Sequence, residues 1–297
     1  MAFNWKTFQT RTLTAVVFAA VMLTGLLWNH WSFLILFSVI HFGCWWEYLA
    51  LLEKIHHQRF HPYLKMGMMA IGYGLMLRFC GPVYAIGGYQ LAGNLALPVS
   101  AAGFALVVLG IFQKNQVSVL SFGAAALGWL YISLSWGLML YLRASDFVLE
   151  QVGEKIIDRV WFYPVLVIAA IWINDTMAYI VGSLIGKRPL SPISPKKTWE
   201  GTIGGIILSV AAITLFGYFS SSSYQHSFSK LKDWIFIPLI ASIIGTLGDL
   251  LESKLKRLAD VKDSGHFMPG HGGFLDRFDS LLFAVPAVWI YVYFFLR

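Results

Sequence analysis

Residues 253–280 read SKLKRLADVKDSGHFMPGHGGFLDRFDS, and this polar stretch interrupts a chain that is otherwise strongly apolar. Over 297 residues, 58% of the side chains are hydrophobic, 12% are charged, and the mean hydropathy is +0.67. A soluble domain is nearer half apolar and one quarter charged. Apolar runs of about 17–25 residues, the length that crosses a bilayer as a helix, recur along the chain. The sequence therefore predicts an all-α polytopic integral membrane protein, because helices satisfy their own backbone groups inside lipid.

The apolar runs predict about nine transmembrane helices. We expect a single membrane domain over residues 1–297, with N-terminal hydrophobic spans in 1–145 and catalytic spans and loops in 160–297. The predicted spans are 13–29, 31–53, 64–82, 93–113, 118–142, 160–186, 201–220, 234–256 and 277–296. Segment 83–97 is rich in glycine, which favours a loop or a re-entrant piece, and a tenth span there is the alternative.

The positive-inside rule orients these spans. Most of the 22 lysines and arginines fall in loops on the same side as the N-terminus, which predicts that the N-terminus is cytoplasmic. This topology and anionic lipid headgroups account for the net charge of +7, so no nucleic-acid partner is predicted. The two cysteines, Cys44 and Cys80, lie in or beside apolar runs and indicate buried thiols. Residues 143–159 form a mixed-charge outer loop, for which we predict an amphipathic turn of helix.

Carboxylates inside or at the ends of spans are the strongest functional signal, because ionisable groups are costly in lipid. Asp249 and Glu252 have i, i+3 spacing and share a helix face, and Asp276 and Asp279 repeat that spacing. Hard oxygen ligands of this kind suit Mg²⁺. Asp276 as a simple helix cap, and Glu252 as the partner of Lys256, remain alternatives.

The sixth predicted span contains a further polar pair, Asn174 and Asp175. If these residues serve the same site, that site is a water-filled funnel open to the cytoplasm, since an isolated carboxylate in hydrocarbon would protonate. The alternative is a structural Asp175 bonded to a neighbouring helix.

The run PGHGG between the carboxylates predicts a polyphosphate site. Glycines allow several N–H groups to point at one anion, and His271 adds a donor beside Gly272 and Gly273. Cations flank this run and also occupy the other cytoplasmic loop; they are Lys254, Lys256, Arg257, Lys262 and Arg277, with Lys196 and Lys197. The alternative is that these cations only reflect the positive-inside rule and do not bind phosphate.

The quoted stretch resembles the signature of the CDP-diacylglycerol synthases, also called phosphatidate cytidylyltransferases. The matching positions are Ser253, Leu255, Lys256, Arg257, Lys262, Asp263, Gly265, Pro269, His271, Gly272, Gly273, Asp276, Arg277 and Asp279. Residues 174–201, NDTMAYIVGSLIGKRPLSPISPKKTWEG, are similar to a second shared region of that family.

This resemblance implies that CTP and phosphatidic acid react to give CDP-diacylglycerol and pyrophosphate. It also implies a paired metal centre with Mg²⁺ and K⁺. The predicted metal ligands are Asp249, Asp276 and Asp279, and the predicted catalytic residues are Asp249, Asp276, Lys256 and Arg277. The predicted substrate-binding residues are Asn174, Asp175, Lys196, Lys197, Ser253, Arg257, Lys262, Asp263, His271, Gly272 and Gly273.

Two other functions remain open at this point. One is a related CTP-dependent enzyme that acts on another lipid, such as a CDP-archaeol synthase or a polyprenol kinase. The other is an ion-coupled transporter whose path uses Asn174, Asp175 and Asp249, although these groups lie toward one side of the membrane. We expect a bacterial inner membrane as the location, an active site that faces the cytoplasm, and a homodimer as the assembly.

Overall fold

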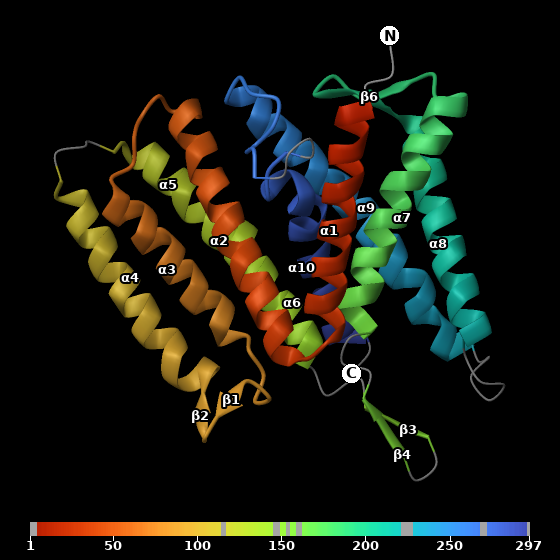
Figure 1. The fold of residues 1–297 in the computed structure, drawn as a ribbon, viewed down its shortest axis with the longest axis horizontal. Helices are drawn as coiled ribbons and strands as arrows, with labels where there is room; N and C mark the ends of the chain where they lie inside the picture. Colours follow the sequence, from red (N-terminus) through yellow and green to blue (C-terminus); the bar gives the residue numbers. More distant parts are fainter. Residues whose placement is uncertain are drawn as a thin grey trace. The chain divides into compact units, whose positions relative to one another are not determined.

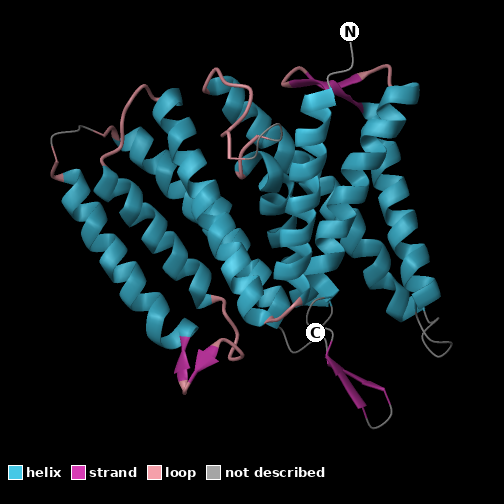
Figure 2. Ribbon diagram, in the orientation of Figure 1, coloured by secondary structure: helices cyan, strands magenta, loops and turns pink. Residues whose placement is uncertain are grey.

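The computed structural model describes residues 5–113, 117–144, 149–152, 155–158, 162–220, 228–267 and 272–295. Helices dominate these residues, and the strands form only short hairpins (Figures 1 and 2). The chain divides into two compact units, which are described separately below. Unit 1 is Met1–Ser145 with Leu255–Phe278, and unit 2 is Asp146–Lys254 with Asp279–Arg297.

Unit 1 contains the first helices of the chain. In order they are α1 (Trp5–Leu27), α2 (His30–Ile55), α3 (Pro62–Arg78), strands β1 (Ala85–Ile86) and β2 (Tyr89–Gln90), a π-helical turn η1 (Leu91–Leu95), α4 (Ala96–Ile111), α5 (Val119–Gly128), a second π-helical segment η2 (Trp129–Leu134) and α6 (Ser135–Ala144). Helices α3 and α4 lie side by side (Figure 1). Because β1 and β2 form a hairpin inside segment 83–97, the tenth span that the sequence left open is not formed there.

Aromatic side chains build the core of unit 1. Phe37 of α2 packs against Trp136 of α6 with ring centroids 5.1 Å apart, and Trp136 packs against Phe278 at 5.7 Å. All three rings are buried. Phe278 belongs to the polar stretch 253–280, so this stretch is joined to the N-terminal helices by apolar packing.

Unit 2 contains the remaining elements. They are β3 (Leu149–Val152), β4 (Lys155–Asp158), α7 (Phe162–Ile185), β5 (Pro189–Ser191), β6 (Ser194–Thr198), α8 (Trp199–Ser220), α9 (Phe228–Leu258) and α10 (Leu275–Phe295). The last turn of α9 and the first turn of α10 belong to unit 1. Strands β3 and β4 pair antiparallel, so the amphipathic helical turn predicted for residues 143–159 is wrong.

Small residues allow helices α7 and α8 to pack closely. A Cβ atom on Gly201 would lie 2.6 Å from the carbonyl oxygen of Ala178, and one on Gly205 would lie 2.7 Å from that of Asn174. Ser209 also donates a hydrogen bond to the carbonyl oxygen of Ala170 at 2.8 Å. Such contacts are typical of helices that associate within lipid, where no hydrophobic force draws them together.

Seven helices among the described residues are long and apolar enough to cross a membrane. They are His30–Ile55, Leu91–Ile111, Val119–Ala144, Phe162–Ile185, Trp199–Phe219, Lys232–Leu258 and Leu275–Phe295, and Thr12–Leu27 is a shorter apolar helix. The prediction of an all-α polytopic membrane protein is confirmed. The count of about nine spans and the cytoplasmic N-terminus stay predictions.

Candidate active site

Three carboxylates meet between α9 and α10 in unit 2. One carboxylate oxygen each of Asp249, Glu252 and Asp279 lies within 4.8 Å of the other two. Glu252 is 0% exposed and Asp279 is 8% exposed. Because like charges repel at this spacing in a buried setting, the group calls for a cation, and its hard oxygen donors are those that Mg²⁺ prefers. The residues present therefore fit the predicted magnesium ion.

Glycines on α9 bring the carboxylates together. A Cβ atom on Gly248 would lie 2.6 Å from the carbonyl oxygen of Asp279, and one on Gly245 would lie 3.4 Å from the Cβ of Ser280. The two helices thus touch through backbone at the level of the cluster. The i, i+3 spacing of Asp249 and Glu252 then turns both side chains toward α10.

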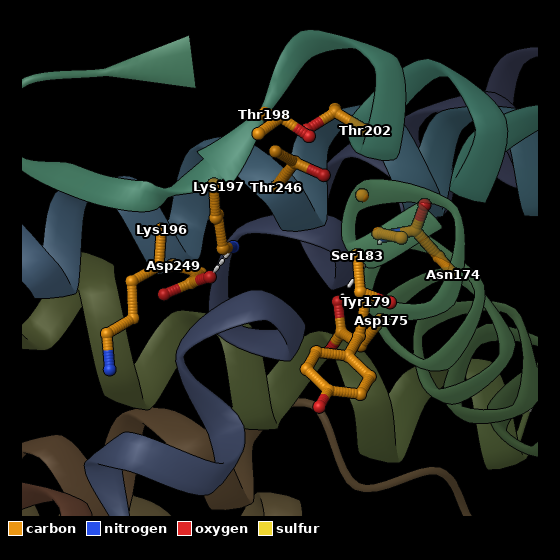
Figure 3. A pocket seen from close by; sticks show the side chains of 12 residues that line it. Asn174, Asp175, Tyr179, Ser183, Lys196, Lys197, Thr198, Thr202, Thr246 and Asp249 are labelled. Atoms are coloured by element: carbon orange, nitrogen blue, oxygen red, sulfur yellow. Dashed lines mark hydrogen bonds and ion pairs between the residues drawn. The ribbon is translucent and has the colours of Figure 1, made fainter. Parts of the chain in front are cut away.

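A cavity of about 390 Å³ opens beside Asp249. Its walls come from four elements, α7, β6, α8 and α9 (Figure 3). The polar residues that line it are Asn174, Asp175, Tyr179, Ser183, Lys196, Lys197, Thr198, Thr202, Thr246 and Asp249. Four of the predicted substrate-binding residues therefore share one cavity with a predicted metal ligand.

Lys197 carries positive charge into this cavity. Its ammonium group forms an ion pair with the carboxylate of Asp249 (Figure 3). The hairpin that presents Lys197 is fixed at its base, because Glu200 accepts hydrogen bonds from the backbone N–H groups of Lys187 at 3.1 Å and Arg188 at 3.2 Å. Lys196, one residue earlier on β6, is exposed.

Asn174 and Asp175 form another wall of the cavity. Asn174 is 3% exposed, and its Oδ1 atom accepts no hydrogen bond from the residues that the structure describes. Its Nδ2 atom lies 3.4 Å from Oδ1 of Asp175, and the Asp175 side chain is exposed where it lines the cavity. Asp175 is therefore the exposed member of this pair, and Asn174 is the buried one.

Asp276 has a different environment from the three clustered carboxylates. Its Oδ1 atom lies 2.7 Å from Nζ of Lys256, and its Oδ2 atom accepts from the N–H groups of Ser264 and Gly273 at 2.9 and 2.8 Å. The Ser264 hydroxyl approaches the same oxygen at 2.9 Å. Both oxygens of Asp276 are thus engaged by the chain itself, so metal binding by Asp276 would require Lys256 or Ser264 to release it.

The glycine-rich run is also held by carboxylates. The N–H groups of Phe274 and Leu275 donate to Glu47 of α2, and that of Gly273 donates to Asp276. Gly272 has a φ of +83°, a conformation that favours glycine. The predicted phosphate contact through Gly273 therefore requires its N–H group to leave Asp276, and His271 lies outside the described residues.

The other predicted residues are placed as follows. Ser253 is buried on α9, where its hydroxyl lies 3.4 Å from Oδ1 of Asp249. Four side chains are exposed on unit 1: Arg257, Lys262, Asp263 and Arg277.

Two carboxylates that these contacts bring into the site region are missing from the predicted site residues. Glu252 shares the face of Asp249, so its spacing was a sufficient signal for a third ligand. Glu47 was a lone carboxylate inside an apolar span, which by itself marks a functional candidate.

Known proteins resemble this chain over most of its length. The profile of the cytidylyltransferase family matches residues 9–295. The chain belongs to the cytidylyltransferase family. It is 30% identical to the phosphatidate cytidylyltransferase of Staphylococcus aureus (strain COL) over 285 residues, which are 94% of this chain and 96% of that protein.

Two further relatives of this cytidylyltransferase are more similar over a shorter stretch. The phosphatidate cytidylyltransferase of Bacillus subtilis (strain 168) is 40% identical over 185 residues, 62% of this chain and 63% of that protein. That of Staphylococcus haemolyticus (strain JCSC1435) is 36% identical over 189 residues, 63% of this chain and 65% of that protein. These two matches cover less than two thirds of each relative.

Proposed function

We propose that the chain is a phosphatidate cytidylyltransferase, which converts CTP and phosphatidic acid to CDP-diacylglycerol and pyrophosphate. The observation that carries this proposal is the sharing of Asp249 between a three-carboxylate cluster and a cavity that contains Lys197. A nucleoside triphosphate needs both a divalent cation and fixed positive charge, and the cavity wall supplies groups for each. Relatives that bear this enzyme name support the choice.

In the proposed reaction, a phosphate oxygen of phosphatidate attacks the α-phosphorus of CTP. The bond between that phosphorus and the oxygen bridging to the β-phosphorus breaks, and pyrophosphate leaves with the electron pair. The attacking oxygen is already anionic, so the chain needs no strong general base. Its residues act by holding the reactants in line and by offsetting negative charge.

The chain's own groups have separate tasks in this mechanism. Asp249, Glu252 and Asp279 would hold Mg²⁺, which offsets the charge of the phosphates when it is bound. Lys197, which pairs with Asp249 in the cavity wall, would offset negative charge on a phosphate of CTP. Asn174 supports this wall of the cavity through its hydrogen bond to Asp175. The family resemblance implies that K⁺ binds as a second cation.

The location and assembly belong to the same proposal. We place the protein in a bacterial inner membrane with its cavity open to the cytoplasm, where CTP is present, and phosphatidate enters from the inner leaflet with its acyl chains in lipid. Its bacterial relatives and apolar helices support a membrane location. The proposed homodimer is tested by light scattering of the detergent-solubilised protein.

The test is an assay of the purified protein in mixed micelles with radiolabelled CTP, phosphatidate and Mg²⁺. We expect label in the lipid fraction and release of pyrophosphate, and neither with the Asp279→Asn variant. Parallel reactions replace phosphatidate by a polyprenol or by an archaeol-type ether lipid phosphate, and CTP by ATP, GTP or UTP. A labelled product only from one of these alternatives would overturn the proposed substrates.

A further inference from the structure

Glu47 of α2 contacts a segment that lies more than 200 residues later in the chain. Its Oε1 atom accepts from the N–H group of Phe274 at 2.9 Å, and its Oε2 atom accepts from that of Leu275 at 2.8 Å. The hydroxyl of Ser264 lies 2.8 Å from the same Oε2 atom. Glu47 is 6% exposed, so these three donors surround a carboxylate that is almost removed from solvent.

The packing around this carboxylate leaves no room for a side chain. A Cβ atom built on Gly265 or on Gly273 would lie 2.2 Å from Oε1 of Glu47. One turn earlier on α2, a Cβ atom on Gly43 would lie 2.4 Å from the ring of Phe274. The segment between α9 and α10 is called the signature loop, and its described residues are 259–267 and 272–274. Glycines on both sides of the contact thus let this loop pack closely against α2.

The contact completes the start of α10. The first N–H groups of a helix have no partner within the helix and must be satisfied from outside. Glu47 accepts from Leu275, the first residue of α10, and from Phe274 before it. A carboxylate at this position also interacts favourably with the helix dipole. In most helices a neighbouring residue of the same segment provides this cap, whereas here another helix provides it.

We propose that Glu47 is a positioning residue of the cytidylyltransferase, which fixes Ser264 and Phe274 of the signature loop and the first turn of α10. Asp279, a member of the carboxylate cluster, lies in the next turn of that helix, so the direction of α10 at its start governs where Asp279 projects. Glu47 itself contacts no substrate in this role. The effect on catalysis rests on the proposed function, while the effect on the loop does not.

The chemistry of the contact requires a carboxylate. Both oxygens of Glu47 accept from backbone N–H groups, which cannot become acceptors. In Glu47→Gln the amide NH₂ would face one of these N–H groups, so one buried donor would lose its partner. The change keeps the size of the side chain and therefore tests the hydrogen bonds with little change in packing.

Helix α2 offers a matched control. Glu53 accepts from the backbone N–H group of Phe60 at 2.8 Å and pairs with Lys65 at 2.8 Å. Like Glu47 it is a glutamate of α2 that caps a backbone amide. Its partners lie within 12 residues of it, far along the chain from the signature loop. Glu53→Gln thus removes the same negative charge from α2 at a place that the proposal does not involve.

The experiment is amide hydrogen–deuterium exchange of the full-length protein in detergent, followed by kinetics. In Glu47→Gln we expect exchange at residues 274–275 to accelerate by about 10-fold or more, the effect of a lost hydrogen bond to a charged group, with exchange at Phe60 unchanged. Glu53→Gln should leave exchange at residues 274–275 unchanged. Glu47→Gln should also lower kcat more than it raises KM for either substrate, whereas Glu53→Gln should leave both near the wild-type values.

Unchanged exchange at residues 274–275 in Glu47→Gln would overturn the proposal, and so would equal acceleration there in Glu53→Gln. If Glu47→Gln does not fold, Glu47→Asp replaces it: the carboxylate is kept but withdrawn by one methylene, and an intermediate acceleration confined to residues 264–275 is expected. Exchange needs no turnover. Failure of the wild-type protein to make CDP-diacylglycerol would therefore refute the proposed function and leave the role of Glu47 in the loop to be judged separately.

Discussion

Lys197 and Asp249 form an ion pair in the wall of the unit 2 cavity, so the cation predicted to bind phosphate is held by a carboxylate predicted to bind metal. The ammonium group offsets part of the negative charge that Asp249 shares with Glu252 and Asp279. In the proposed reaction Lys197 has two partners in succession, the carboxylate of Asp249 before the substrates bind and a phosphate afterwards.

Replacement of Lys197 should therefore affect both stability and turnover. For Lys197→Met we expect kcat/KM for CTP to fall by roughly 100-fold, the usual effect of one lost charge-stabilising donor. We also expect a lower melting temperature without Mg²⁺, since Asp249 loses its counter-charge. Lys187→Met is the control, because Lys187 is an exposed cation of the same connection that does not line the cavity. Equal losses in the two variants would contradict a specific role for Lys197.

Replacement of Asp279 should separate metal binding from folding. Asp279→Asn removes one charge from a buried group of three, so the melting temperature in EDTA should stay equal to that of the wild type or rise. Turnover should fall by at least about 100-fold. The rise in melting temperature that we expect from Mg²⁺ in the wild type should be lost in the variant. A variant that keeps full stabilisation by Mg²⁺ would remove Asp279 from the metal site.

Asp276 should behave in the opposite way. Its carboxylate is paired with Lys256 and accepts two backbone N–H groups, so Asp276→Asn should destabilise the protein by about 3 kcal/mol, the usual cost of breaking a buried ion pair. The melting temperature should fall with or without Mg²⁺. Thermal shift measurements in EDTA compare Asp276→Asn directly with Asp279→Asn. If the melting temperature of both variants is higher than that of the wild type, Asp276 belongs to the repulsive cluster.

The glycines of the signature loop should be intolerant of any side chain. In Gly273→Ala the new methyl group would meet the carboxylate of Glu47, so we expect a loss of stability and of activity together. Gly123→Ala on α5 is the control, because no atom lies within 4 Å of its Cβ position and alanine favours a helix by about 1 kcal/mol. Melting temperatures of the two variants test this. A Gly273→Ala variant with the melting temperature and activity of the wild type would contradict the packing of Glu47 against the loop.

The cavity should be accessible from the cytoplasm at residue 175. With Cys44 and Cys80 replaced by alanine, Asp175→Cys should react with a charged, membrane-impermeant thiol reagent in inside-out vesicles, and CTP with Mg²⁺ should slow the reaction. Ala241→Cys, at a buried position of α9, should stay unreactive. If the cysteine at 175 reacts only in right-side-out vesicles, the proposed orientation of the protein is wrong.

Local sequence signals were sufficient for the helices and for much of the candidate site. The predicted span 160–186 corresponds to helix Phe162–Ile185, because length and hydropathy alone define a membrane helix. The i, i+3 spacing placed Asp249 beside Glu252 on one face. The hairpin at residues 149–158 was mistaken for a helical turn, because its mixture of charged and apolar residues fits either periodicity over so short a length.

Contacts between distant residues could not be predicted in the same way. Asp276 carried the spacing of a metal ligand, and only the folded chain shows that Ser264 and Lys256 enclose it. Nothing in the apolar span around Glu47 indicated a partner 227 residues away. Periodicity describes neighbours along one element, whereas such pairings depend on how elements pack.

The span of the Glu47 contacts has a consequence for biosynthesis. During translation the N-terminal helices emerge first, so Glu47 is present long before Leu275, which follows it by 228 residues. Contacts of such high sequence separation close late in folding. A ribosome that stalls before residue 274 would therefore leave Glu47 without its two backbone donors, and a fragment containing only the two family-specific segments would have an α10 without this cap. Helix α2 in the N-terminal half thus supplies a cap that the C-terminal segment cannot supply for itself.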